Sequence, residues 1–160
     1  MDHFALPGDG LAQARHNGSL NRNFMGYTDL ASDNMLGLGV SSISELGNAY
    51  HQNVKTLKEY YSCIEKAELP TLRTHLLSEE EQKTRSTIKD LMCRLKTSKE
   101  ENKLTDAESL YEMEKDGLIT MDEWGWQITE NGLPFIRNIA ACFDPYFNRK
   151  KEIRQFSSAI

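Results

Sequence analysis

The chain has 160 residues, of which 39% are hydrophobic and 27% charged, and its formal net charge at pH 7 is −5. This length and composition predict a globular protein with one domain or two small packed subdomains, and exclude an intrinsically disordered chain. The acidic balance disfavours nucleic acid as a partner, because neutralising phosphates requires a basic face. No apolar run reaches the ~20 residues that span a bilayer.

The first fifty residues contain short apolar runs and many glycines and asparagines. We predict the end of a buried strand at Asp2–Leu6, a short helix over Asp9–His16 and a second strand over Leu36–Ser44. Gly37 and Gly39 weaken that strand on propensity alone. In a strand pattern, such glycines usually mark a bulge or the close approach of another backbone or a ligand.

Helical periodicity begins after these residues. Asn53 is predicted to cap a helix that ends before Pro70. Ser78 and Glu81 form a capping-box pattern at the start of a second helix, and Thr97–Asn102 reads as a polar loop. The apolar faces of the two helices are Val54, Leu57, Tyr61 and Ile64 in the first, and Ile88, Leu91, Met92 and Leu95 in the second.

The C-terminal third is predicted to hold two further helices around a hairpin. Thr105 and Glu108 repeat the capping-box spacing, and Gly117 suits the left-handed residue after a helix end. Pro134 would cost an intrahelical hydrogen bond in a helix starting at Glu130, so the last helix is expected to start near Leu133. Its apolar residues are Leu133, Ile136, Ile139, Ala140 and Phe143.

The hairpin is predicted from Leu118–Met121 and Trp124–Ile128, with Asp122-Glu123 at its turn. Trp124 and Trp126 alternate with a glycine, so we expect them to share one strand face and close the core. The order helix, helix, hairpin, helix is typical of a winged-helix-like domain.

The three cysteines are widely separated, which favours reduced thiols in a cytoplasmic protein over a disulfide framework. Cys63, Cys93 and Cys142 each lie among apolar residues, so we interpret them as core packing, and shared ligation of a cluster as the less favoured alternative. The histidines at 16, 51 and 75 lack the paired spacing of a metal site. Gly37-x-Gly39 lacks the third glycine of a dinucleotide-binding motif.

Several segments together resemble the oxygen-independent coproporphyrinogen III oxidases, a family of radical S-adenosylmethionine (SAM) enzymes of haem synthesis. The resemblance runs from Asp2 to Ile160. It is most specific in Arg22-Asn23-Phe24-Met25-Gly26-Tyr27-Thr28-Asp29 and in Leu36-Gly37-Leu38-Gly39-Val40-Ser41-Ser42-Ile43-Ser44, and it includes Met1-Asp2-His3-Phe4-Ala5 and Ile136-Arg137-Asn138-Ile139.

The resemblance implies an α+β, mostly helical fold that corresponds to the C-terminal part of such an enzyme. Residues 1–50 are expected to be a remnant of the radical SAM barrel, namely the last strands of an incomplete α/β barrel. Residues 51–160 are expected to form a helical, winged-helix-like cap domain. The partners implied are an N-terminal radical SAM barrel segment and a porphyrinogen substrate, with no nucleic acid and no membrane.

The activity that the resemblance implies is the oxidative decarboxylation of two propionates of coproporphyrinogen III, which gives protoporphyrinogen IX. A [4Fe–4S] cluster, held in the family by C-x-x-x-C-x-x-C, cleaves SAM to start the reaction. That motif does not occur in this sequence. We therefore expect no catalytic residues, no metal ligands and no activity from this chain alone, as a natural truncation, a split-gene product or a cloned fragment.

The resemblance also implies part of a second SAM site, formed by Phe24, Met25, Gly26 and Ile43. A ring such as Phe24 can stack on adenine, Gly26 permits close backbone approach, and Ile43 offers an apolar wall. The family tends to have Gln where Met25 stands, so affinity for SAM should be lower. The alternative reading is a packed loop at the barrel mouth.

Two further residues are expected to contact substrate. Arg22 suits the carboxylates of substrate or SAM, because a guanidinium matches a carboxylate's geometry; a structural salt bridge is the alternative. His3, at a strand end, is expected to face the cavity or to be a satisfied core or rim histidine. Tyr27 is expected to pack, with its hydroxyl hydrogen-bonded.

Two other functions remain open from the sequence. The chain could be a stand-alone porphyrin- or haem-binding or interaction module without catalysis. It could also be a nucleic-acid-binding winged helix, suggested by the hairpin and by the basic residues between Lys83 and Lys103, although the acidic total makes this the weakest reading.

Overall fold

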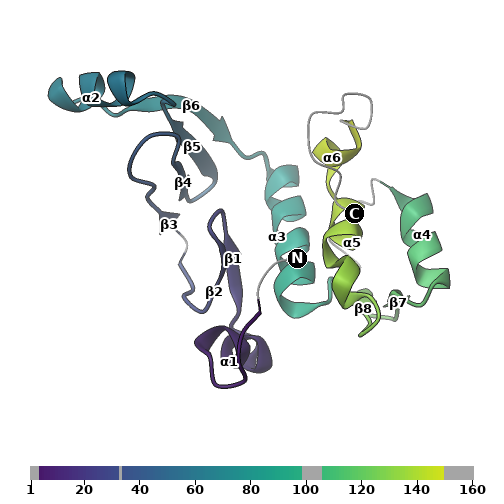
Figure 1. The fold of residues 1–160 in the computed structure, drawn as a ribbon. Coiled ribbons are helices and arrows are strands. Elements are labelled where there is room, and N and C mark those ends of the chain that lie inside the picture. The colour runs from purple at the N-terminus through teal and green to yellow at the C-terminus, as the bar shows by residue number, and fades with distance from the viewer. Residues whose placement is uncertain (1–3, 33, 99–105, 150–160) are drawn as a thin grey trace. The chain divides into compact units, whose positions relative to one another are not determined.

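The computed structural model describes residues 4–32, 34–98 and 106–149 (Figure 1). The chain forms two compact units, one comprising residues 1–30 and 83–160 and the other residues 31–82. We call them the first and the second unit. The bounds of these units differ from the predicted domains 1–50 and 51–160. Those domains were defined by the expected match to a longer enzyme, and they stay a prediction.

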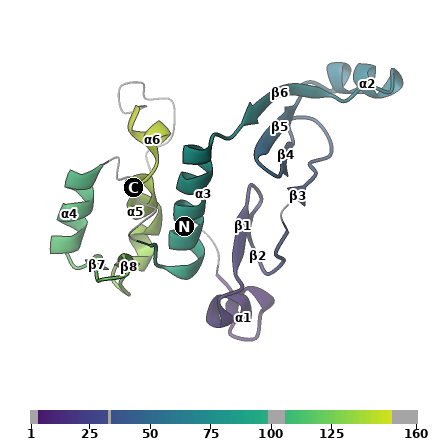
Figure 2. The same ribbon diagram turned by 180° about the vertical axis from the view of Figure 1, so that it is seen from behind.

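The first unit combines helices with two small hairpins (Figure 2). Its elements are α1 (Gly10–Asn17), β1 (Asn21–Asn23), β2 (Gly26–Thr28), most of α3 (Glu79–Arg94), α4 (Ala107–Lys115), β7 (Ile119–Met121), β8 (Trp126–Ile128), the 3-10 helix η1 (Leu133–Phe135), α5 (Ile136–Ala141) and α6 (Pro145–Arg149). The predicted order of helix, helix, hairpin and helix appears as α3, α4, β7–β8 and η1–α5.

The N-terminal helix is confirmed, but the strand predicted before it is wrong in its described part. Asp9 caps α1, since its side chain accepts a hydrogen bond from the Leu11 amide. Phe4 and Leu6 are exposed and belong to no strand. Asp2 and His3 lie outside the described residues. No neighbouring strand pairs with Phe4–Leu6 among the described residues, so the apolar run alone was misleading.

The core of the first unit matches the predicted apolar faces. Leu91 and Met92 of α3 are buried, and Ile88 and Leu95 pack against them. The last helical segment begins at Leu133 as predicted, with η1 leading into α5, and α5 contributes Ile136, Ile139 and Ala140 to the same cluster. Phe143, just after α5, joins them. Cys93 and Cys142 lie in this cluster, as expected for packing cysteines.

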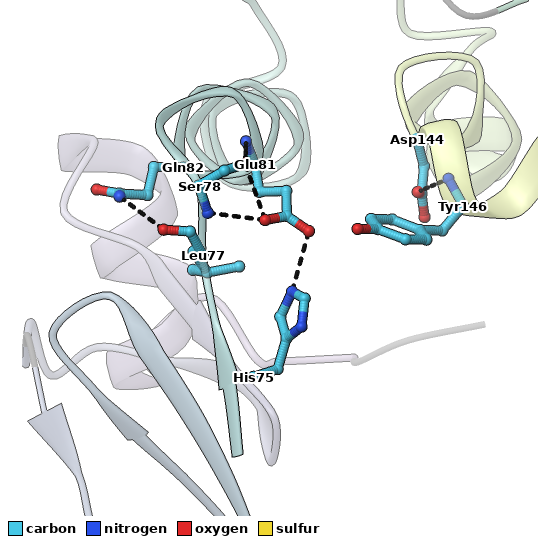
Figure 3. A network of polar contacts seen from close by, with 7 residues as sticks. All are labelled: His75, Leu77, Ser78, Glu81, Gln82, Asp144 and Tyr146. Carbon is cyan, nitrogen blue, oxygen red and sulfur yellow. Dashed lines mark hydrogen bonds and ion pairs between the residues drawn. The ribbon is translucent and has the colours of Figure 1, made fainter.

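The capping box at the start of α3 is confirmed (Figure 3). The Glu81 amide donates to Ser78 Oγ at 3.3 Å, and the Ser78 amide donates to Glu81 Oε2 at 2.7 Å. Glu81 Oε1 lies 3.0 Å from His75 Nε2, and the Gln82 side chain donates to the Leu77 carbonyl. The two Ser78–Glu81 contacts satisfy amides that the start of the helix leaves without partners.

Helix α4 is capped one residue later than predicted. Asp106, not Thr105, accepts a hydrogen bond from the Ser109 amide at 3.1 Å; Thr105 itself lies outside the described residues. The end of α4 is confirmed, because Gly117 has φ +72° immediately after it. A short aspartate side chain caps as well as threonine does, so the capping-box spacing did not fix the register.

The C-terminal hairpin is confirmed, but one of its tryptophans is not in the core. The Asp122 amide donates to the Gly125 carbonyl, and the Asp122 side chain accepts from the Trp124 and Gly125 amides. These contacts place Trp124 in the turn, where 75% of it is exposed, while Trp126 is buried in β8. Gly125, with φ +149°, interrupts the alternation that was expected to align the two rings.

The second unit is a four-stranded antiparallel sheet in the order β3-β4-β5-β6, with one helix. Its elements are β3 (Asn34–Met35), β4 (Ile43–Leu46), β5 (Ala49–Asn53), α2 (Leu57–Glu65), β6 (Thr71–Leu76) and the beginning of α3.

The strand predicted over Leu36–Ser44 is wrong for most of its length. A Cβ on Gly37 would lie 2.7 Å from the Ile43 carbonyl oxygen, and Gly39 and Ser41 have φ of +96° and +60°. The chain therefore loops, and the loop is held by the Asn53 side chain, which donates to the Gly39 carbonyl and to Ser42 Oγ.

The same asparagine explains a second correction. Asn53 ends β5 and pairs with Thr71, so it does not cap a helix. Thr56 caps α2, accepting a hydrogen bond from the Glu59 amide at 3.3 Å. The apolar face predicted for this helix exists by spacing, but no residue of α2 is buried.

None of the described helices has both the length and the apolar character needed to cross a bilayer.

Candidate functional site

The segment with the most specific motif folds as a short hairpin. Strands β1 and β2 pair in antiparallel register, with Arg22 opposite Tyr27 and Asn23 opposite Gly26. The two residues between them, Phe24 and Met25, form the apex. Asn23 Oδ1 accepts a hydrogen bond from the Met25 amide at 2.8 Å, which fixes the turn locally.

The apex presents apolar side chains to solvent. Phe24 is 51% exposed and Met25 is 85% exposed. Gly26 has φ +129°, a backbone conformation that side chains other than hydrogen disfavour. In this chain the apex therefore displays an aromatic ring and a thioether beside a residue without a side chain, and the packed-loop alternative stays open.

The base of the hairpin is anchored to the core of the first unit. The Tyr27 hydroxyl donates to the Met92 carbonyl of α3 at 3.2 Å, as expected for a packed tyrosine. The Arg22 guanidinium carbon lies 4.9 Å from the centroid of the Tyr27 ring, in a cation–π contact. This contact orients Arg22 from the opposite strand.

Arg22 also lines a cavity of about 460 Å³ inside the first unit. The walls come from the hairpin, α3, α4, α5 and the segment up to α6. Met92 and Met113 give it apolar walls, and Arg137, Asp106 and Asp144 add charge to Arg22. Two guanidinium and two carboxylate groups thus border one cavity.

The two carboxylates of the cavity have structural tasks. Asp106 caps α4, and Asp144 Oδ1 accepts a hydrogen bond from the Tyr146 amide at 2.8 Å at the start of α6 (Figure 3). Their charges also suit the positive end of a helix dipole. Arg22 and Arg137 are the cationic side chains among the described residues that line this cavity.

The predicted site residues lie in different parts of the two units. Arg22 lines the cavity, whereas Phe24, Met25 and Gly26 form the hairpin apex and do not. Ile43 begins β4 of the second unit, where it pairs with Gln52 and is half-buried. His3 lies outside the described residues.

Sequence reasoning missed the roles of Asp106, Arg137 and Asp144. A signal existed for the aspartates, because Asp106 precedes an apolar helical pattern and Asp144 precedes Pro145, a residue favoured at the first helical position. Nothing in the sequence indicated that both helix starts border one cavity.

The cysteines and histidines form no metal site in the part of the chain that the structure describes: no group of three metal-ligating side chains occurs there. The cysteines are free thiols. Burial raises the pKa of the Cys93 thiol, and the nearby Lys89, Arg22 and Arg94 only partly oppose this.

Comparison with known proteins gives the same relatives by sequence and by structure, although no family model matches the chain. Relatives from Escherichia coli K12 and Synechocystis, both named oxygen-independent coproporphyrinogen III oxidase, are 40% and 38% identical to the chain over its whole length. A relative of the same name from Thermostichus vulcanus is 36% identical.

A solved structure agrees with these relatives. Coproporphyrinogen III oxidase from Escherichia coli, described as a radical SAM enzyme, matches 91% of the chain with a TM-score of 0.81 and 39% identity. The chain covers 36% of that structure and 37%, 38% and 53% of the three relatives. The predicted resemblance is thereby confirmed: over its whole length the chain is similar to oxygen-independent coproporphyrinogen III oxidases, and it matches only part of their length.

Proposed function

We propose that the chain is the C-terminal portion of an oxygen-independent coproporphyrinogen III oxidase. The observation that carries the proposal is the end-to-end match to relatives of that name, of which the chain spans little more than a third in the Escherichia coli enzyme. The whole enzyme would oxidatively decarboxylate two propionates of coproporphyrinogen III in the cytoplasm, giving protoporphyrinogen IX.

Within this function, residues 1–50 are the end of the radical SAM barrel and residues 51–160 are the cap over its cavity. The order of α3, α4, β7–β8 and α5 supports a winged-helix-like cap. The chain then supplies walls for the reaction, while an N-terminal barrel segment supplies the [4Fe–4S] cluster. The absence of C-x-x-x-C-x-x-C in the chain supports its being inactive alone.

The hairpin apex fits part of a SAM site. The exposed ring of Phe24 can stack on adenine, and Gly26, with no side chain, lets the ligand approach the backbone. Ile43 would add an apolar wall from β4. When bound, SAM supplies the oxidising chemistry; the residues of this chain only hold and orient it.

Arg22 and His3 are the proposed contacts to substrate carboxylates. The cation–π contact with Tyr27 holds the guanidinium in one orientation, which lowers the entropy lost on binding a carboxylate. Its place in the wall of the cavity supports a contact with a bound carboxylate.

A hybrid enzyme tests the proposal. The segment of the Escherichia coli oxidase that aligns with residues 1–160 is replaced by this chain, and the hybrid is reconstituted anaerobically with iron and sulfide. We expect protoporphyrinogen IX from the hybrid, measured by porphyrin chromatography, and none from the chain alone. Stoichiometric cluster incorporation by the chain alone would refute the proposed division of labour, as would an inactive hybrid that binds its cluster.

The same hybrid tests the SAM site. Met25→Gln restores an amide that can donate and accept hydrogen bonds, so we expect SAM to bind about two- to tenfold more tightly. Leu30→Gln, an exposed change outside the apex, is the matched control and should leave affinity unchanged. Equal effects of the two substitutions in equilibrium dialysis would exclude the apex from the site.

A haem titration of the chain alone separates the stand-alone binding module from this proposal. A specific, shifted Soret band would favour the module, and we expect none.

A further inference from the structure

The second unit has little core of its own. Its buried residues, among those described, are Ser44, Ala49, Pro70 and Leu77. The large buried cluster draws every member from the first unit. Because a fold of this size depends on burying a large share of its apolar surface, the second unit is short of stabilising contacts.

Helix α2 shows the deficit most clearly. Leu57, Tyr61 and Ile64 follow the spacing of one helix face and expose 61%, 58% and 49% of their surface. We call these three residues the α2 apolar face. A helix of nine residues is marginal in water by itself, and helices in proteins are stabilised mainly by packing such a face.

The helix is nevertheless held on a neighbouring side. Tyr60 packs edge-on against Tyr61, with ring centroids 6.1 Å apart, and its hydroxyl accepts a hydrogen bond from the Gly39 amide at 3.2 Å. Thr56 caps the helix start. Of these contacts, the Tyr60–Gly39 hydrogen bond ties α2 to another segment of its own unit, and the other two are local to the helix. The α2 apolar face stays exposed.

We propose that the α2 apolar face docks onto the part of the oxidase polypeptide that this chain does not match, and becomes buried when the two are joined. The inference rests on the proposed function. The choice of this partner rests on the relative lengths of the two proteins. The Escherichia coli structure matches 91% of this chain, yet the chain covers 36% of that structure, so most of the relative has no counterpart here.

The charges around the face favour a protein over a lipid surface. Helix α2 carries Glu59 and Glu65 against a single cation, Lys58. Helices that lie on anionic membranes instead have a polar side rich in Lys and Arg. An apolar stripe of this kind, bordered by mixed charges, is typical of contact with another protein surface.

A graft tests the proposal. Residues 54–69 replace the aligned segment of the otherwise intact Escherichia coli oxidase. Hydroxyl-radical footprinting then compares the labelling of Leu57, Tyr61 and Ile64 in the graft and in the 160-residue chain. We expect strong labelling in the chain alone and a several-fold decrease in the graft.

Substitutions give a second measurement. Leu57→Asp and Ile64→Asp should lower the melting temperature of the graft by several degrees and leave that of the chain alone unchanged. Lys58→Asp, on the same helix but outside the face, should be neutral in both. This control separates lost apolar contact from a general effect of added negative charge.

Two outcomes would overturn the proposal. Equal labelling in chain and graft means that no other segment covers the face. Protection already present in the chain alone means that another part of the same chain covers the α2 apolar face. If dilution removes that protection, a second copy of the chain covers it instead. Neither outcome bears on the proposed function, because the graft retains the catalytic segments of the Escherichia coli enzyme. An inactive full hybrid in which the α2 apolar face is protected would refute the proposed function and not the docking of α2.

Discussion

At the scale of single residues, the chemistry of Cys93 is set by its surroundings. The thiol lies in the core on α3, and desolvation of the thiolate raises its pKa despite Lys89, Arg22 and Arg94. Since the folded state holds the proton more tightly than the unfolded chain, this group stabilises the fold fully below the unfolded pKa of about 8.5. That contribution is lost as pH rises through the higher folded pKa.

We therefore expect the stability gap between the native protein and Cys93→Ala to narrow as pH rises above about 8.5. Urea unfolding at several pH values between neutral and alkaline gives the two free energies of unfolding. Cys142→Ala, another buried thiol of the same core, tests whether the effect is particular to residue 93. A difference in the free energy of unfolding between the native protein and Cys93→Ala that stays constant with pH would contradict the raised pKa of Cys93.

At the scale of elements, local signals predicted structure where the chain itself supplied the partner. The Ser78–Glu81 box was predicted correctly because its two residues lie three positions apart at one helix start. The apolar stripe of α3 was predicted correctly because helical periodicity sets which residues share a face, whatever they pack against. Asn53 was misassigned because its partner, Thr71, is in another strand. The strand predicted over Leu36–Ser44 failed because Gly39 and Ser41 adopt positive φ, which breaks an extended segment and is not readable from a short apolar run.

The candidate site divides in the same way. The hairpin apex is a local structure within the motif around Phe24, but no hairpin was predicted there. The cavity depends on α3, α4 and α5 meeting, so nothing in the sequence indicated that Asp106, Arg137 and Asp144 border the same cavity. Ile43 lies in β4 of the second unit, so no local sequence pattern can link it to the hairpin apex.

Gly132 gives an element-scale prediction. It precedes η1, and a Cβ there would overlap the Leu118 carbonyl oxygen that accepts the Thr129 amide. Gly132→Ala should therefore destabilise the protein by about 1–3 kcal/mol, as overpacking in a well-packed interior does. Gly8→Ala, whose added methyl would meet no atom within 4 Å, should change the free energy of unfolding little. Equal denaturation midpoints for the two variants would contradict the clash.

At the scale of the whole molecule, stability is unevenly distributed. The first unit holds the buried cluster, including the fully buried Leu91, Ile119 and Ile139. The second unit relies on backbone pairing in its sheet, and all residues of β6 are exposed. Segments with few buried apolar contacts open at lower free energy than core elements.

Native-state hydrogen exchange should resolve this difference in the chain alone. We expect slow exchange for amides of α3 near Leu91 and for Ile128, which donates to the Leu95 carbonyl. Amides of β6 and α2 should exchange through smaller openings, with little dependence on denaturant. Uniform protection across both units would show that the second unit has a stabilising interior after all.

In the β1–β2 hairpin, the residues that anchor the segment are separate from those that are exposed to a ligand. Tyr27 and Arg22 tie its base to α3, while the side chain at position 25 meets almost nothing. Replacing Met25 should therefore change the free energy of unfolding little, so an amide can take the place of the thioether without destabilising the hairpin. Ligand preference can drift at the apex without disturbing the scaffold that carries it.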